Sequence, residues 1–246
     1  MKVGINVTTE FLAKDAHKAA KRGDLIIVVD VLRCTSTVVT ALANGAREII
    51  PVKSLREARR MRAENPSYLL AGERGGLKPS GFDLGNSPLE YMREKVFGKT
   101  IVLTTTSGTK ALNNSKGARW VLVGSFLNLN AVSEKALSIA ISEGTDICIV
   151  QSGTNGEFSL EDFICAGAII DSLNSLTKGD VNLSDAAKAA LLGFTYVKND
   201  LCASIMRSRH STRLIKMGFI EDIRFSCQMN LFPITPFYNG RSITLK

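Results

Sequence analysis

The chain has 246 residues, of which 45% are hydrophobic and 22% are charged, and its formal net charge is +8. This is the composition of a globular protein, and no stretch reaches the roughly 20 apolar residues that a membrane-spanning helix needs. The densest basic run, residues 56–62, contains an acid and lies on a helical pattern, so the positive charge favours a small anionic ligand over nucleic acid.

The N-terminal segment lacks the apolar core and the small-residue cleavage site of a secretory signal peptide. The five cysteines are scattered and include no C-x-x-C pair, which is typical of reduced thiols. We therefore expect a cytoplasmic protein that has no membrane partner.

Strand-length apolar runs alternate with helical patterns through the first two hundred residues. In chain order, the prediction is a strand at 25–29, a helix at 36–44, a strand at 48–52, a helix at 54–64, strands at 68–71 and 100–103, a helix at 109–115, a strand at 120–123, a helix at 130–142, a strand at 146–150, and helices at 160–176 and 184–196. This alternation predicts an α/β fold in which helices cover a largely parallel or mixed sheet. From residue 198 onward we expect a helix and covering strands.

Three segments repeat one pattern, in which an apolar strand is followed by a loop rich in Thr, Ser and Gly and then by a helix of small residues. They span residues 26–52, 99–125 and 145–171, and the first two also share a Gly-Ala-Arg turn. The repetition predicts a fold built from strand–polar loop–helix units. We expect residues 1–246 to form a single compact unit, with two similar fused halves meeting near residues 90–100 as the alternative.

The polar loops of these repeats, at 35–37, 104–109 and 152–156, are expected to face one pocket, because ligands of open α/β sheets bind where strands end and helices begin. Hydroxyls and helix N-termini suit phosphate, and the guanidinium of Arg33 matches phosphate or sulfonate oxygens. One such loop alone is most often a helix cap. Three of them, together with Asp30 and Arg33, favour a binding site.

Carboxylates follow the same strands. Asp30 ends one strand, Glu73 follows another, and Glu161 and Asp162 open a helix, where the helix dipole alone would favour acids. Several carboxylates beside a phosphate site suit Mg²⁺, which takes oxygen ligands. The two histidines show no zinc-ligand spacing, there is no P-loop or G-x-S-x-G elbow, and we interpret Cys34 as a packing residue.

Seven motifs, in order, resemble the 2-phosphosulfolactate phosphatase family: "VVDVLRCTSTVVTALANGA", "AGERGG", "GFDLGNSPLE", "TTTSGTKAL", "GSFLNLNAV", "FSLEDFICAGAII" and "GFIEDIRFSCQMN". The resemblance runs from about residue 25 to about residue 235. It implies a three-layer α/β/α phosphatase, dependent on Mg²⁺, that converts 2-phosphosulfolactate to 3-sulfolactate in coenzyme M biosynthesis. The alternatives are action on another phosphorylated hydroxy acid, or a non-catalytic anion or nucleotide sensor.

On this interpretation the catalytic residues are Asp30, Arg33, Glu73 and Asp162. The candidate metal ligands are Asp30, Glu73, Glu161 and Asp162. The candidate substrate-binding residues are Thr35, Ser36, Thr37, Arg74, Asn86, Thr106, Ser107, Gly108 and Thr109. Arg74 or a C-terminal basic residue such as Arg213 would hold the substrate's second anionic group, and Asp30 is the candidate if a phosphoenzyme forms. The expected partner is a small anionic phosphorylated substrate, and a homodimer is compatible with such an enzyme.

Overall fold

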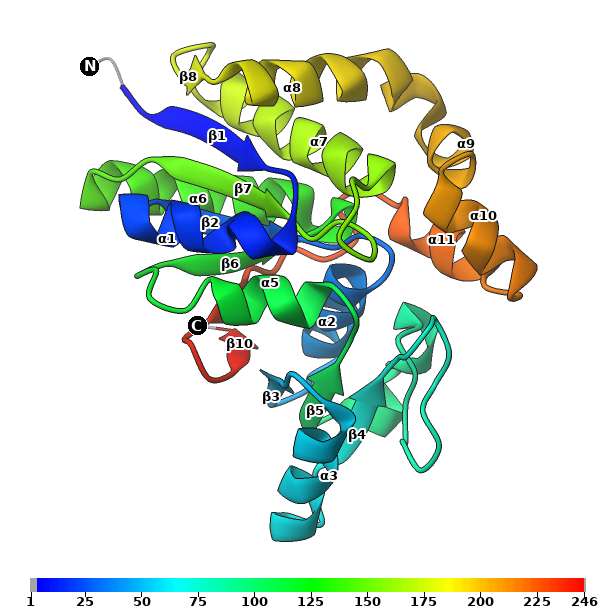
Figure 1. Cartoon of the computed structure of the whole chain (residues 1–246). Coiled ribbons are helices and arrows are strands. Elements are labelled where there is room, and N and C mark those ends of the chain that lie inside the picture. The colour runs from blue at the N-terminus through cyan, green and yellow to red at the C-terminus, as the bar shows by residue number, and fades with distance from the viewer. Residues whose placement is uncertain (1–3, 246) are drawn as a thin grey trace.

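The computed structural model describes residues 4–245, so the first residues of the N-terminal segment discussed above lie outside it. Ten strands form one mixed, mostly parallel sheet with helices on both faces (Figure 1). The strands are β1 (Asn6–Glu10), β2 (Leu25–Val29), β3 (Glu48–Pro51), β4 (Leu69–Gly72), β5 (Thr100–Thr104), β6 (Val121–Gly124), β7 (Ile147–Gln151), β8 (Asn182–Leu183), β9 (Pro236–Tyr238) and β10 (Ile243–Leu245). The predicted α/β fold is confirmed.

The α-helices begin and end within two residues of the predicted bounds wherever bounds were predicted; after residue 198, where one helix was expected, the described residues form three. The α-helices are α1 (Ala16–Arg22), α2 (Cys34–Ala43), α3 (Leu55–Glu64), α4 (Arg93–Val96), α5 (Gly108–Asn114), α6 (Leu129–Glu143), α7 (Leu160–Leu176), α8 (Asp185–Val197), α9 (Leu201–Met206), α10 (Arg209–Lys216) and α11 (Ile220–Ser226). Within the described residues, no helix has the length and apolar character needed to cross a bilayer.

The central strands are buried on both faces, which explains their continuous apolar sequences. In β2, Leu25, Ile27 and Val29 pack into the core that contains α6, α7 and α8. The alternate residues Ile26 and Val28 pack into the core that contains α1, α2 and α5. Because successive strand side chains point to opposite faces, this alternation makes the sheet the middle layer of three.

The sheet contains two parallel blocks. Strand order is β4-β5-β3-β10-β9-β6-β2-β7-β1-β8, with the β9–β10 hairpin pairing antiparallel to β6 on one side and to β3 on the other. The C-terminal strands were expected to cover the sheet, but they instead lie inside it and join the blocks. Figure 1 shows the β4–β5 block running crosswise to the β2–β7–β1 block, so that the carboxyl ends of both blocks approach each other.

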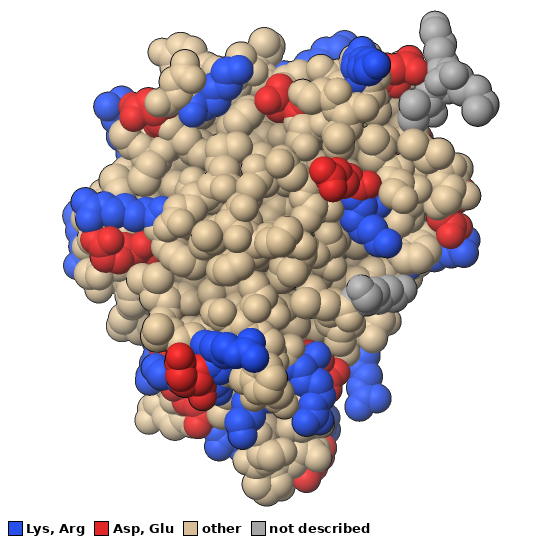
Figure 2. Space-filling view, turned by 180° about the vertical axis from the view of Figure 1, so that it is seen from behind, with Lys and Arg blue, Asp and Glu red and all other residues tan. Residues whose placement is uncertain are grey.

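Charged side chains do not form a basic stripe on the face opposite to that seen in Figure 1. Figure 2 shows Lys and Arg beside Asp and Glu around the margins of that face, and a broad area without charged side chains between them. A protein that binds nucleic acid usually gathers its basic residues along one surface. The net charge of +8 therefore does not define a nucleic-acid track on this face.

Candidate active site

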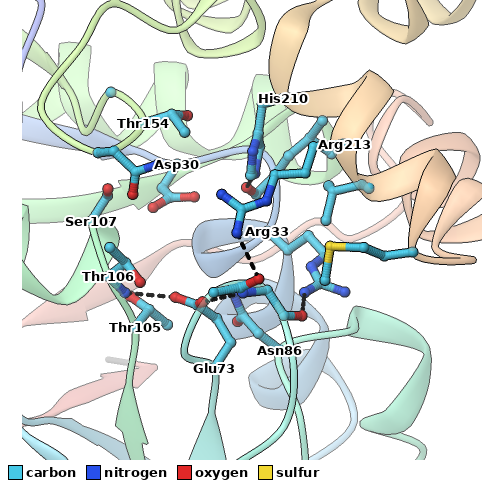
Figure 3. Close-up of a pocket in the computed structure, with 17 residues that line it drawn as sticks. Asp30, Arg33, Glu73, Asn86, Thr105, Thr106, Ser107, Thr154, His210 and Arg213 are labelled. Atoms are coloured by element: carbon cyan, nitrogen blue, oxygen red, sulfur yellow. Dashed lines mark hydrogen bonds between the residues drawn. The ribbon is translucent and has the colours of Figure 1, made fainter.

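A pocket lies where the carboxyl ends of the two parallel blocks face α10 (Figure 3). Five parts of the chain contribute its walls. They are Asp30, Leu32 and Arg33 after β2; Glu73, Gly75, Gly76 and Asn86 after β4; Thr105, Thr106 and Ser107 after β5; Gly153, Thr154 and Asn155 after β7; and His210, Arg213, Leu214 and Met217 on or beside α10. Segments up to 187 residues apart (Asp30 to Met217) thus converge on one cavity.

Asp30 is a buried carboxylate at this pocket. The backbone N–H of Cys34 donates to its Oδ1 at 3.2 Å. The pKa of Asp30 is raised to about 7, chiefly by burial; the negative charges of Glu73 and Glu161 add to the rise, whereas the Cys34 N–H opposes it. A carboxylate with this environment would be stabilised by a cation or by a proton.

Glu73 connects two of the loops that form the pocket. The N–H of Gly76 donates to one of its carboxylate oxygens at 2.8 Å, and the N–H of Thr106 donates to the other at 2.6 Å. Figure 3 shows Glu73 opposite Asp30, with Thr105 and Thr106 beside it. Because a carboxylate has about four acceptor positions, each oxygen of Glu73 keeps capacity for a further ligand.

Asp162 does not line the pocket but binds the backbone of two loops that do. Its two oxygens accept the N–H groups of Val31 and Gly153, at 2.9 and 3.2 Å. Burial raises the pKa of Asp162 well above its ordinary value, and the neighbouring charges of Asp30 and Glu161 add to this effect. Asp162 therefore holds the loop after β2 beside the loop after β7.

The guanidinium of Arg33 lies in the pocket wall but is already engaged by protein groups. It pairs with the carboxylate of Asp222 at 2.6 Å, donates to the carbonyl of Gly76 at 2.6 Å, and lies over the ring of Phe219. Arg74, another candidate, does not line the pocket, since it donates to the carbonyl of Glu73 and to the hydroxyl of Thr104.

The hydroxyls at 35–37 are buried and do not line the pocket, although they lie at the N-terminus of α2. Thr35 accepts the N–H of Asp30, Ser36 donates to the carbonyl of Val31, and Thr37 donates to the carbonyl of Asn86. All three therefore fix the backbone around Asp30 and Asn86.

The loop after β5 divides between lining and support. Thr105, Thr106 and Ser107 line the pocket. Thr109, the second residue of α5, is buried behind them; its N–H donates to the hydroxyl of Thr105, and its own hydroxyl accepts the N–H of Thr105. Gly108 permits close packing, because a Cβ there would lie 2.7 Å from Oδ2 of Asp30.

Helix α10 contributes His210, which the sequence analysis did not propose for the site, and Arg213, which it named as the alternative to Arg74. His210 lines the pocket and its Nε2 lies 2.9 Å from the carbonyl oxygen of Leu32, which makes Nε2 the donor. The Nδ1 atom is buried without a hydrogen-bond partner. Arg213 reaches the other rim and donates to the carbonyl of Gly75 at 2.9 Å. The cluster of basic residues and His210 in "RSRHSTR" was the available signal, but nothing in the sequence placed it beside Asp30.

The four carboxylates proposed as metal ligands do not form one ligand set. Asp30 and Glu73 line the pocket, whereas Glu161 lines a neighbouring cleft and Asp162 lies behind the loops. Among residues 4–245, no group of three or more His, Cys, Asp and Glu side chains is placed to hold a metal ion. Two of the four, Asp30 and Glu73, therefore share one pocket.

Two carboxylates still fit Mg²⁺, which keeps several waters and is commonly held by one or two carboxylates and the phosphate of a substrate. Asn86 adds an oxygen of the kind that Mg²⁺ prefers. Its side chain is buried at the same pocket, and its Oδ1 atom has no hydrogen-bond partner. Asp30, Glu73 and Asn86 are therefore the residues able to hold the ion.

Cys34 does not supply a nucleophile. It is fully buried as the first residue of α2, and burial raises the pKa of its thiol well above the ordinary value, with the charge of Asp30 adding to the effect. The thiolate is the reactive form of cysteine. Cys34 therefore remains a protonated packing residue.

Together, the fold and the pocket define an α/β protein whose candidate active site combines buried carboxylates, hydroxyls and an arginine at the carboxyl ends of its strands. The sequence model of the family described as "2-phosphosulpholactate phosphatase" matches residues 11–241. The chain belongs to this 2-phosphosulfolactate phosphatase family, which confirms the resemblance seen in its motifs.

Two relatives illustrate how much of the chain the similarity covers. A Thermotoga petrophila protein named "Probable 2-phosphosulfolactate phosphatase" is 47% identical over 210 residues, covering 85% of this chain and 87% of the relative. A Clostridium novyi protein of the same name is 38% identical over 234 residues, covering 94% of this chain and 96% of the relative. The match to the family model, over residues 11–241, includes every segment that lines the pocket.

Proposed function

We propose that this chain is a Mg²⁺-dependent phosphatase that hydrolyses 2-phosphosulfolactate to 3-sulfolactate and phosphate. Family membership and the names of the relatives support the reaction. The structural observation that carries the proposal is the pairing of Asp30 with Glu73 across a pocket whose third wall holds three consecutive hydroxyl residues.

The phosphoryl group would lie between the two carboxylates and the loop at 105–107. In phosphoryl transfer, negative charge is spread over the phosphoryl oxygens, so donors fixed in advance stabilise the transition state. The hydroxyls of Thr105, Thr106 and Ser107 would be such donors. Glu73 keeps this loop in place, because it accepts the Thr106 N–H.

Asp30 and Glu73 would orient the attacking water and, with Asn86, hold the metal ion. Bound Mg²⁺ would supply positive charge to the phosphoryl oxygens. The electrostatics support a cation here, since burial and the charge of Glu73 both raise the pKa of Asp30. A neighbouring positive charge would favour the ionised form of both carboxylates.

The test is phosphate release from a panel of phosphorylated hydroxy acids, sulfonated and carboxylated, with Mg²⁺ and with EDTA. We expect 2-phosphosulfolactate to be the preferred substrate and EDTA to abolish turnover. Asp30→Asn should lower kcat at least about a hundredfold. Asp185→Asn, which removes an exposed carboxylate on α8, is the matched control.

Each part of the proposal can fail separately. Full activity in EDTA would remove the metal from the mechanism, and a higher kcat/KM for phospholactate would reassign the substrate. Undiminished turnover by a folded Asp30→Asn variant would exclude Asp30. Absence of phosphate release from every member of the panel would leave the non-catalytic anion-binding alternative.

A further inference from the structure

A second, wider cleft adjoins the pocket. The pocket itself has a volume of about 50 Å³, whereas the cleft has about 460 Å³, and the two share Thr154, Asn155, His210 and Arg213 in their walls. A volume of about 50 Å³ holds only a few water-sized groups. A phosphoryl group would largely fill it, so the rest of a phosphorylated hydroxy acid would extend beyond the pocket, and the adjoining cleft offers space for it.

The cleft carries three arginines. Arg209 is neutralised by an ion pair with Glu157 at 2.6 Å. Arg207 forms no ion pair with any of the described residues. Among the same residues, Arg213 donates one hydrogen bond, to the carbonyl of Gly75, and forms no ion pair. Glu161 is the other acid in the wall, and it is buried. Two guanidinium groups are therefore available to an anion.

Ser159 gives an independent indication of a ligand. It is the N-cap of the 17-residue helix α7, but its side chain makes no capping hydrogen bond. The residue is 3% exposed and lines the cleft, and its Oγ is buried without a partner. An N-cap serine normally accepts a helix N–H, and a buried hydroxyl without a partner costs free energy. A ligand oxygen would satisfy it.

Asp162, in the first turn of α7, does not face this end of the helix, whereas Glu161 of the same turn is buried in the cleft wall. The carboxylate of Asp162 turns away toward the N–H groups of Val31 and Gly153. The partial positive charge at the N-terminus of a long helix favours an anion beside Ser159.

We infer that this cleft is a second anion subsite, in which Arg207, Arg213 and Ser159 bind the carboxylate or sulfonate of the substrate. The phosphoryl group would then lie beside Asp30 and Glu73. The inference rests on the proposed function, and it names the residues that distinguish a polyanionic phosphoester from a simple one.

The test compares kcat/KM for 2-phosphosulfolactate with kcat/KM for p-nitrophenyl phosphate, which has no second anionic group. In Arg207→Gln the ratio of the two should fall about tenfold to a hundredfold, mainly through a higher KM for 2-phosphosulfolactate, because a charge-assisted hydrogen bond is lost. In Ser159→Ala the ratio should fall about threefold to tenfold. Arg56→Gln on α3 makes the same change in net charge far from the cleft and should leave the ratio unchanged.

An unchanged ratio in Arg207→Gln, with normal turnover by the wild type, would overturn the subsite and leave the phosphatase proposal intact. If the wild type hydrolyses neither substrate, calorimetry with 3-sulfolactate decides the subsite alone. Binding by the wild type that weakens at least about tenfold in Arg207→Gln would support it. Absence of binding, or equal binding by both proteins, would overturn it.

Discussion

The guanidinium of Arg33 and the carboxylate of Asp222 form a buried ion pair at 2.6 Å, although 189 residues separate them in the chain. The second oxygen of Asp222 accepts the hydroxyl of Ser87 at 2.6 Å. Arg33 also donates to the carbonyl of Gly76. One pair thus connects the loop after β2, the β4–β5 connection and α11, and it holds the C-terminal helices against the pocket.

Removing the charge of Asp222 should destabilise the protein strongly. Asp222→Asn leaves the Arg33 guanidinium buried without a counter-charge, and we expect the free energy of unfolding to fall by about 3–5 kcal/mol in urea denaturation. Glu221→Gln removes a neighbouring acid that pairs with Arg224 on the surface, and it should change stability by no more than about 0.5 kcal/mol. Equal stabilities of the two variants would show that the buried pair does not hold this region.

Asp30 should make the stability of the metal-free protein depend on pH. Its pKa is raised from 3.8 to about 7 in the folded chain, so the folded state favours the protonated form. This contribution to stability is complete below about pH 4 and is lost as the pH rises through about 7. Asp30→Asn cannot ionise and therefore avoids the loss.

The free energy of unfolding of Asp30→Asn should accordingly equal that of the wild type near pH 4. Above pH 8 it should exceed that of the wild type by up to roughly 4 kcal/mol. The measurement is urea denaturation across this range in EDTA, with Asp185→Asn as the control. A stability difference between Asp30→Asn and the wild type that does not change with pH would mean that Asp30 ionises as easily in the folded chain as in the unfolded chain.

Gly108→Ala should disturb both packing and catalysis. A methyl group at this position would lie 2.5 Å from Cβ of Cys34 and 2.7 Å from Oδ2 of Asp30. Relief of this overlap should cost about 1–3 kcal/mol of stability and displace Asp30, so phosphate release should fall with it. Lys110→Ala, an exposed change in the same helix, should do neither, and full activity in Gly108→Ala would show that Asp30 tolerates displacement.

Thr109 should stabilise the loop through its hydrogen bonds to the backbone of Thr105. Its hydroxyl accepts the Thr105 N–H at 3.2 Å and donates to the Thr105 carbonyl at 3.0 Å. Thr109→Ala should therefore lower the free energy of unfolding by about 1–2 kcal/mol, whereas Thr109→Ser should restore most of it. If the serine variant is as unstable as the alanine variant, then packing of the methyl group, and not the hydroxyl, is what matters.

The elements that the sequence predicted are those with strong local signals. β2, β5 and β7 are continuous apolar runs because both of their faces are buried, and α7 was predicted with its observed bounds. β1 was not predicted, since its sequence NVTTE is mostly polar and only alternate residues are buried. The loops at 104–109 and 152–156 were expected at the pocket, and each places residues there.

The division between lining and supporting residues could not be predicted. Thr35 and Thr105 stand in similar hydroxyl-rich loops and both accept a backbone N–H, but only Thr105 also lines the pocket. Glu73 follows a strand and Asp162 opens a helix, and of these two carboxylates only Glu73 lines the cavity. In each case the direction of the side chain depends on which distant loop packs against it.

The sequence by itself determined the alternation of strands and helices, the polar loops at the strand ends and the family, because local periodicity and contiguous motifs carry that information. Only the tertiary structure decided that the β9–β10 hairpin lies within the sheet and that α10 brings His210 and Arg213 to Asp30. These arrangements arise from contacts between residues far apart in the chain, such as that of Arg33 with Asp222, and no local pattern records which partners will meet.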